Sequence, residues 1–230
     1  MLNRVRVSVI LTGMVLLIVQ ALLAEKSFTG NVTGVSTYVY RGNKQNNGPA
    51  LQMNAAVAVK SLRAGLWVSS VDFGGDVEIE TDPFVELSLS SGAVKSAIGT
   101  IIYSYDMFEA FNAGADFEIE LYGKLSFGAL GLTGYFVPSQ ASTDYDANSS
   151  LYWIEGTTGI KKAGATWSVL AAFGTYSSRW WVPADKDPVG LLVFSAARPV
   201  TEKFAVSWNY AISSKEAMGN NFWVAAGYSF

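Results

Sequence analysis

Two short stretches of the sequence carry acidic residues at alternating positions. The first stretch holds Glu78, Glu80, Asp82 and Glu86, and the second holds Asp116, Glu118 and Glu120. Residues two apart point to the same side of a β-strand, so each stretch would present a row of carboxylates on one face. Such a row can attract cations, and two adjacent carboxylates can also serve as a catalytic acid and base.

The catalytic interpretation is the weaker one. Glu118 and Glu120 would lie about 6.6–6.8 Å apart along a strand, which is a separation used by inverting glycosidases. Any two acids with this spacing on any strand meet the same test. The chain has no His and no Cys, which removes Ser-His catalysis, imidazole and thiolate metal ligands, and disulfides. We therefore expect a protein that is not an enzyme and holds no metal or other cofactor.

The elements that position these acids are predicted to be β-strands. Half of the residues are hydrophobic, yet beyond the first 24 residues no apolar run is long enough for a membrane-spanning helix. Apolar residues alternate instead, which predicts an all-β fold, a transmembrane up-and-down antiparallel β-barrel of about twelve strands. The expected strands are 28–41, 50–60, 62–73, 77–90, 93–105, 116–127, 129–138, 150–162, 165–176, 188–198, 202–213 and 220–230.

The first 24 residues form a separate segment. Arg4 and Arg6 precede an apolar run from Val7 to Leu23, and the small residue Ala24 follows it. This pattern predicts a secretory signal peptide over residues 1–24, with a membrane-anchor helix as the alternative. Residues 25–230 are then the barrel.

The predicted connections alternate between long and short. The longer ones are polar and cover 42–49, 106–115, 138–149, 177–188 and 214–219, whereas the shorter turns lie at 60–61, 91–92, 128–129, 162–163 and 199–203. The connection at 73–76 is the exception, because it falls on the long-loop side but is brief. In outer-membrane barrels the long loops face the outside and the short turns face the periplasm. An even number of strands would place both chain ends on the side of the turns.

The last residues, NNFWVAAGYSF, end on an aromatic at a period of two. Phe222, Tyr228 and Phe230 would lie on the apolar face of a last strand. A terminal strand frays unless it is held, and a closed barrel holds it against the first strand. These three residues also resemble the C-terminal signature of bacterial outer-membrane barrels, which implies recognition by the barrel assembly machinery.

The acid-bearing faces are expected to line the lumen, and the apolar faces to contact outer-membrane lipid. Lys or Arg on a lipid face would cost about 2–4 kcal/mol at the midplane, which fixes the orientation of each strand. The residues expected to line the lumen are Arg41, Glu78, Glu80, Asp82, Glu86, Asp116, Glu118, Glu120, Lys124, Glu155 and Lys161. The acids would favour cations, unless they pair with the bases or only solvate a narrow interior.

Several blocks of the chain resemble a known family. They are FTGNVTGVSTYVYRG, PALQMNAAV, GLWVSSVDFGG, ETDPFVELSLSSG and FEIELYGKLSFGALGLTGYFVP, which together extend over residues 28–138. In these blocks the chain is similar to the TorF-type porins, also called the Gcw_chp family, and the likeness weakens after about residue 160. The resemblance implies an outer-membrane barrel. Thr37 and Val39 stand where the family often carries charge, so a pore role for that strand does not carry over, whereas Arg41 and Gly42 match.

We expect from these observations a passive channel for small hydrophilic solutes or ions in the bacterial outer membrane. The alternative is a barrel that does not conduct and serves envelope structure or surface interaction. The expected partners are outer-membrane lipid, the barrel assembly machinery and small solutes or ions. The formal net charge of −3 argues against nucleic acid.

Overall fold

The computed structural model describes residues 26–72, 78–89, 91–104, 117–138, 151–175 and 188–230. Within these ranges, twelve antiparallel strands hydrogen-bond into a closed barrel. Every strand pairs with its neighbours in chain order, and the pairing of the first strand with the last closes the ring. The predicted up-and-down barrel of about twelve strands is therefore confirmed.

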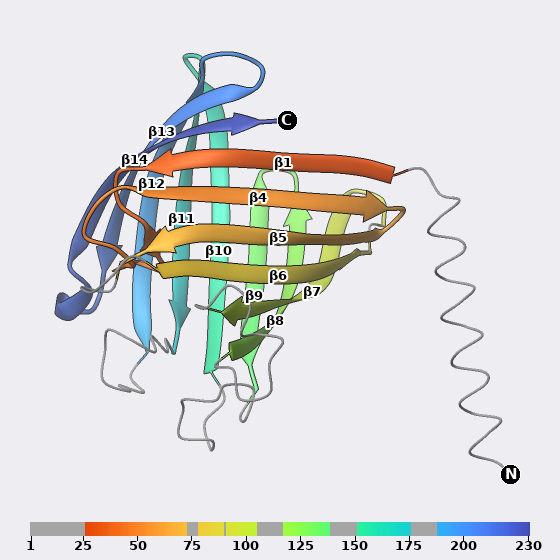
Figure 1. Cartoon of the computed structure of the whole chain (residues 1–230), viewed down its shortest axis with the longest axis horizontal. Helices are drawn as coiled ribbons and strands as arrows, with labels where there is room; N and C mark the ends of the chain where they lie inside the picture. Colours follow the sequence, from red (N-terminus) through yellow and green to blue (C-terminus); the bar gives the residue numbers. More distant parts are fainter. Residues whose placement is uncertain (1–25, 73–77, 90, 105–116, 139–150, 176–187) are drawn as a thin grey trace, which may run out of the picture.

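The barrel strands are eight to twelve residues long, and Figure 1 shows β1, β4, β5 and β6 in one wall with β10 to β12 crossing behind them. Their bounds are β1 (Lys26–Val35), β4 (Ala50–Val59), β5 (Leu62–Val71), β6 (Glu78–Ser88), β7 (Val94–Ser104), β8 (Phe117–Phe127), β9 (Leu130–Val137), β10 (Leu151–Lys162), β11 (Ala165–Gly174), β12 (Val189–Pro199), β13 (Phe204–Ser213) and β14 (Asn220–Ser229). Besides these strands, the described residues form three short elements, β2 (Val39–Tyr40), β3 (Asn43–Lys44) and the 3-10 turn η2 (Glu216–Met218). Among the described residues, no helix is long and apolar enough to cross a membrane.

The outer face of the barrel is apolar and the inner face is polar. On β8, Leu121 and Leu125 are 45% and 51% exposed, whereas Glu120 and Tyr122 on the other face are 1% and 6% exposed. The same contrast recurs on the other strands, where large apolar side chains cover the outside. A strand needs about 9–11 residues to cross a bilayer, which every barrel strand except the eight-residue β9 provides. The sequence alternation thus places the lipid-compatible residues outside.

The connections follow the predicted alternation where the structure describes them. β4 and β5 are joined through Lys60 and Ser61, and β10 and β11 through Ala163 and Gly164. Lys60 and Ala163 have φ values of 54° and 53°, which tight turns of this kind require. The predicted signal peptide and most of the loops at 106–115, 138–149 and 177–188 lie outside the described residues.

The seam between β1 and β14 explains the aromatic last residue. Gly30 and Phe230 exchange backbone hydrogen bonds of 3.0 and 3.1 Å. The Phe230 ring lies over Gly30, where a Cβ would come within 2.5 Å of ring carbon Cε2, and it also stacks on Phe28. Closure therefore uses a glycine on the first strand and an aromatic at the end of the chain.

Candidate functional site in the barrel lumen

The segment from Ser36 to Pro49, called loop 36–49 below, enters the barrel instead of projecting from it. It leaves the seam at Ser36, whose backbone N–H donates to the Val224 carbonyl at 2.9 Å and whose hydroxyl accepts from the Val224 N–H at 3.0 Å. The loop contains the β2–β3 hairpin and four buried side chains, those of Tyr38, Asn43, Gln45 and Asn46. A polar segment that is buried in this way lies inside the lumen.

The tip of loop 36–49 reaches the wall opposite its origin. Around the ring, β8, β9 and β10 lie farthest from β1. Arg41 Nη2 at the tip is 2.9 and 2.8 Å from the two carboxylate oxygens of Glu120 on β8. The Arg41 Cζ atom also lies 4.5 Å from the ring centroid of Tyr135 on β9 and 5.5 Å from that of Trp153 on β10. The loop therefore spans the diameter of the barrel.

A hydrogen-bonded network surrounds this ion pair. The Tyr103 hydroxyl donates to Glu120 Oε1 at 2.8 Å, and the hydroxyls of Tyr40 and Tyr103 are 2.9 Å apart. Burial by itself disfavours the charged guanidinium, but attraction by the negative oxygens of ionised Tyr40 and of Glu120 outweighs this effect, so the pKa of Arg41 lies well above its ordinary value. Arg41 is therefore a fixed cation that holds the loop tip by charge-assisted bonds.

Gly42 provides the second attachment of the tip. Its carbonyl accepts a 2.7 Å hydrogen bond from Asn221 Nδ2 on β14, although the two residues are 179 positions apart. Gly42 has a φ of 86°, and a Cβ there would lie 2.7 Å from Leu191 Cδ1. Only glycine combines this backbone conformation with so close an approach to Leu191.

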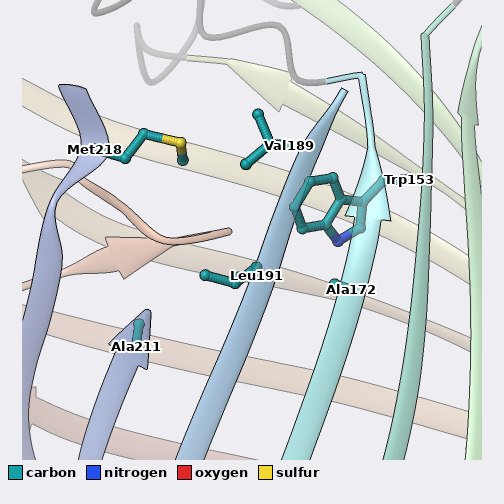
Figure 2. Close-up of a cluster of buried hydrophobic side chains, with 6 residues drawn as sticks. All are labelled: Trp153, Ala172, Val189, Leu191, Ala211 and Met218. Carbon is teal, nitrogen blue, oxygen red and sulfur yellow. The ribbon is translucent and has the colours of Figure 1, made fainter. Parts of the chain in front are cut away.

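An apolar cluster fills part of the lumen beside the tip. Figure 2 shows its members on the inner faces of β10 to β13, with one side chain reaching in from η2. The members are Trp153, Ala172, Val189, Leu191, Ala211 and Met218. A second apolar cluster lies near the origin of the loop and contains Val35, Tyr38, Ala50 and Val71. Side chains of the wall and of the loop thus narrow the lumen toward the long-loop end.

A cavity of about 370 Å³ remains between loop 36–49 and the wall of the barrel. Aromatic rings and a few polar groups form its lining. The lining residues are Val35, Thr37, Tyr38, Val39, Tyr40, Gln52, Asn54, Arg63, Trp67, Asp82, Phe84, Ile101, Tyr103, Tyr122, Lys124, Tyr135 and Trp223. This volume lies within the range of small-molecule sites.

The predicted lumen residues occupy distinct environments. Glu80, Asp82 and Glu120 are buried, and Glu86 accepts from the Lys124 ammonium at 2.6 Å and from the Tyr122 hydroxyl at 3.0 Å. Glu155 accepts a 2.9 Å hydrogen bond from Trp153 Nε1. Glu78 and Lys161 are exposed, Glu118 is half-buried and Asp116 lies outside the described residues. No group of three or more acids in the described part of the chain could hold a metal ion.

Charge is distributed unevenly along the inner face. The acids Glu78, Glu80, Asp82, Glu118 and Glu120 lie in the first five residues of β6 and β8, at the end of the barrel where the long loops emerge. The inward-facing bases lie near the opposite end, within four residues of the short turns, and are Arg63, Lys95, Lys124 and Lys161. The lumen therefore has an acidic end and a basic end.

Two sequence-based expectations about this region are wrong. The first strand ends at Val35 rather than at residue 41, so Arg41 projects from a loop and not from a strand. The polar segment 42–49 lies in the lumen rather than outside. The available signal was the group of amide side chains at Asn43, Gln45 and Asn46, because amides can bond to the backbone of a buried loop, as Gln45 Nε2 does to the Asn43 carbonyl at 3.4 Å. Asn46 Oδ1, for example, accepts from the Tyr38 N–H at 2.7 Å.

Comparisons with known proteins agree with this architecture. Residues 23–224 match the model of a family described as "Bacterial protein of unknown function (Gcw_chp)". A search of the curated proteins found no match. A solved structure from a study of in-meso crystallization of membrane proteins aligns with a TM-score of 0.56 and 8% identity, over 88% of this chain and 83% of that one. At this identity the similarity is one of fold.

Two further solved structures are similar with lower scores. The COG4313 outer membrane channel from Pseudomonas putida F1 has a TM-score of 0.49 and 12% identity, over 88% of this chain and 94% of the channel. OprD from Pseudomonas aeruginosa has a TM-score of 0.41 and 12% identity, over 88% of this chain and 66% of OprD.

Proposed function

The chain belongs to the Gcw_chp family, and from its barrel we propose that it is an outer-membrane channel for passive diffusion of small hydrophilic solutes or ions. The observation that carries the proposal is the closed barrel with an apolar exterior, a polar interior and a cavity beside loop 36–49. The loop sets the size limit, because it crosses the lumen and is held on both sides. The resemblance to outer-membrane channels supports the same proposal.

The ion preference of this channel depends on whether the acidic end or the basic end of the lumen has the larger effect on ion passage. The cation preference expected from the acidic residues stays a prediction. Glu78 and Glu118 support it, since they lie at the long-loop end of the barrel, where a solute would enter. Ion pairing of Glu120 with Arg41 and of Glu86 with Lys124 opposes it. The reversal potential under a salt gradient measures the balance.

The second candidate is a barrel that does not conduct and acts through its outer loops. The two apolar clusters inside the lumen favour this alternative, because they occupy space that an open porin would leave to water. Single-channel recording on the refolded mature chain in a planar bilayer separates the two. Discrete current steps support the channel, and a folded barrel without current supports the structural role.

The C-terminal strand is proposed to bind the barrel assembly machinery. Phe222, Tyr228 and Phe230 are all large, exposed and on the outer face of the seam region. This arrangement supports the proposal, since an assembly factor that captures the last strand would meet these three side chains first. Replacing them by Ala should reduce the amount of folded protein in cells more than the yield of refolding in detergent.

A further inference from the structure

Two cations, Arg63 and Lys124, line the cavity beside loop 36–49 and share one nearby carboxylate, that of Glu86. Three charged residues line it, namely Arg63, Lys124 and Asp82. The Lys124 ammonium pairs with Glu86, and Asp82 is only 5% exposed, so it offers little surface to a solute. In the described part of the chain, no carboxylate lies within ion-pair distance of the Arg63 guanidinium. Arg63 is attracted by Glu86 but has no direct ion pair with it, so its guanidinium can form one with a ligand.

Arg63 is held in place by an aromatic ring rather than by an acid. Its Cζ atom lies 4.7 Å from the ring centroid of Phe84. Glu86 is its partner across the β5–β6 ladder, but the Glu86 carboxylate accepts from Lys124 and Tyr122 instead. A guanidinium that stacks on a ring keeps its hydrogen-bond donors for another group, and its planar fork matches a carboxylate.

The rest of the cavity lining suits the uncharged part of a small ligand that carries a carboxylate. The rings of Trp67, Phe84 and Tyr122 provide flat apolar surfaces, and the amides of Gln52 and Asn54 provide a few hydrogen-bonding groups. A mostly apolar wall with few polar groups and one charged anchor is the usual composition of a small-molecule site. The volume of about 370 Å³ limits the ligand to a small molecule.

We propose that this cavity binds a small organic carboxylate with a planar apolar body, and that Arg63 binds the carboxylate. The proposal rests on the proposed channel function for its biological meaning, since a solute would meet the cavity on its way through the lumen. Binding itself does not depend on conduction, so the two proposals can fail separately.

Benzoate has the required chemistry and serves as the probe, and benzamide is the uncharged control of similar shape. Intrinsic tryptophan fluorescence of the refolded barrel, titrated at constant ionic strength, reports binding because Trp67 and Trp223 line the cavity. We expect saturable binding of benzoate and at least about tenfold weaker binding of benzamide. Arg63→Gln should weaken benzoate binding by a similar factor. Arg63→Lys, which keeps the charge but not the fork, should give an intermediate value.

Arg198→Gln is the matched control, because it removes the same charge from an exposed residue near the end of β12. It should leave benzoate binding unchanged. The migration of unheated and heated samples on gels verifies that each variant is folded. If Arg63→Gln does not fold, the comparison of benzoate with benzamide on the native chain still decides the proposal. Equal binding of the two compounds, or benzoate binding that Arg63→Gln and Arg63→Lys leave intact, would overturn it.

Bilayer recordings on the same preparation distinguish this outcome from failure of the channel. If the protein conducts but does not bind benzoate, the channel proposal stands and the carboxylate-site proposal is overturned. If the folded protein binds benzoate through Arg63 but passes no current, the carboxylate-site proposal stands and the channel proposal is overturned.

Discussion

Arg41 and Glu120 are 79 positions apart in the sequence, and their side chains meet at 2.8 Å inside the barrel. The side chains are only 11% and 1% exposed. Removing one member of a buried ion pair leaves the other charge without compensation, which costs about 3–5 kcal/mol. The contact between loop 36–49 and the opposite wall therefore depends on both residues.

Glu120→Gln tests this dependence. The neutral amide cannot compensate Arg41, so we expect the loop tip to detach, the unfolding temperature to fall and the single-channel conductance to rise or fluctuate. Thermal unfolding and planar-bilayer recordings measure the two effects. Glu202→Gln, at an exposed turn position, should change neither. An unaltered conductance in the Glu120 variant would show that the loop does not limit the pore.

Gly42→Ala tests the second attachment of the loop. A Cβ at this position meets Leu191, and the positive φ is unfavourable for alanine, so we expect a loss of about 1–3 kcal/mol in the free energy of unfolding. Gly48→Ala is the matched control in the same loop, because nothing lies within 4 Å of its Cβ position. Equal stability of the two variants in denaturant titrations would argue against the packing of Gly42 on Leu191.

Gly30→Val tests the closure of the barrel. The new side chain would collide with the Phe230 ring, whereas Gly34→Val on the same strand meets nothing within 4 Å. We expect Gly30→Val to reduce the folded fraction after refolding and Gly34→Val to have little effect. Heat-dependent gel migration measures the folded fraction. Similar yields for both variants would indicate that the seam tolerates displacement of Phe230.

Neutralising acids at the long-loop end tests the ion preference. In a variant with both Glu80→Gln and Glu118→Gln, the reversal potential under a salt gradient should move away from the equilibrium potential of the cation. Lys124→Gln should move it in the opposite direction, because a base is lost. A reversal potential that none of these changes affects would exclude the fixed lumen charges as the source of selectivity.

Much of the fold could be predicted because it is encoded in local alternation. Leu121 and Leu125 alternate with Glu120 and Tyr122, and this pattern determines both the strand and its orientation. The turns at Lys60 and Ala163 fall within a residue or two of their predicted positions. The aromatic at Phe230 correctly indicated a terminal strand that is held by closure.

The path of loop 36–49 could not be predicted in the same way. Thr37, Val39 and Arg41 continue the alternation of the first strand, and the backbone at β2 is extended, so the local pattern is that of a longer strand. The hairpin partner of Val39 is Lys44 and not a residue of the wall. The inward path is determined by contacts with Glu120, Leu191 and Asn221, which are remote in the sequence. The candidate cavity was missed for the same reason, since its lining combines this loop with distant strands.

The path of loop 36–49 also has a mechanical consequence. A barrel wall is a single sheet, and an external load can flatten its circular outline into an oval. The chain from Ser36 to Arg41 acts as a crossbar, which ties the seam to β8 and resists widening along that one diameter. Deformation that leaves this diameter unchanged does not load the bonds of Ser36 to Val224 or of Arg41 to Glu120, so the stiffness of the pore outline should depend on direction.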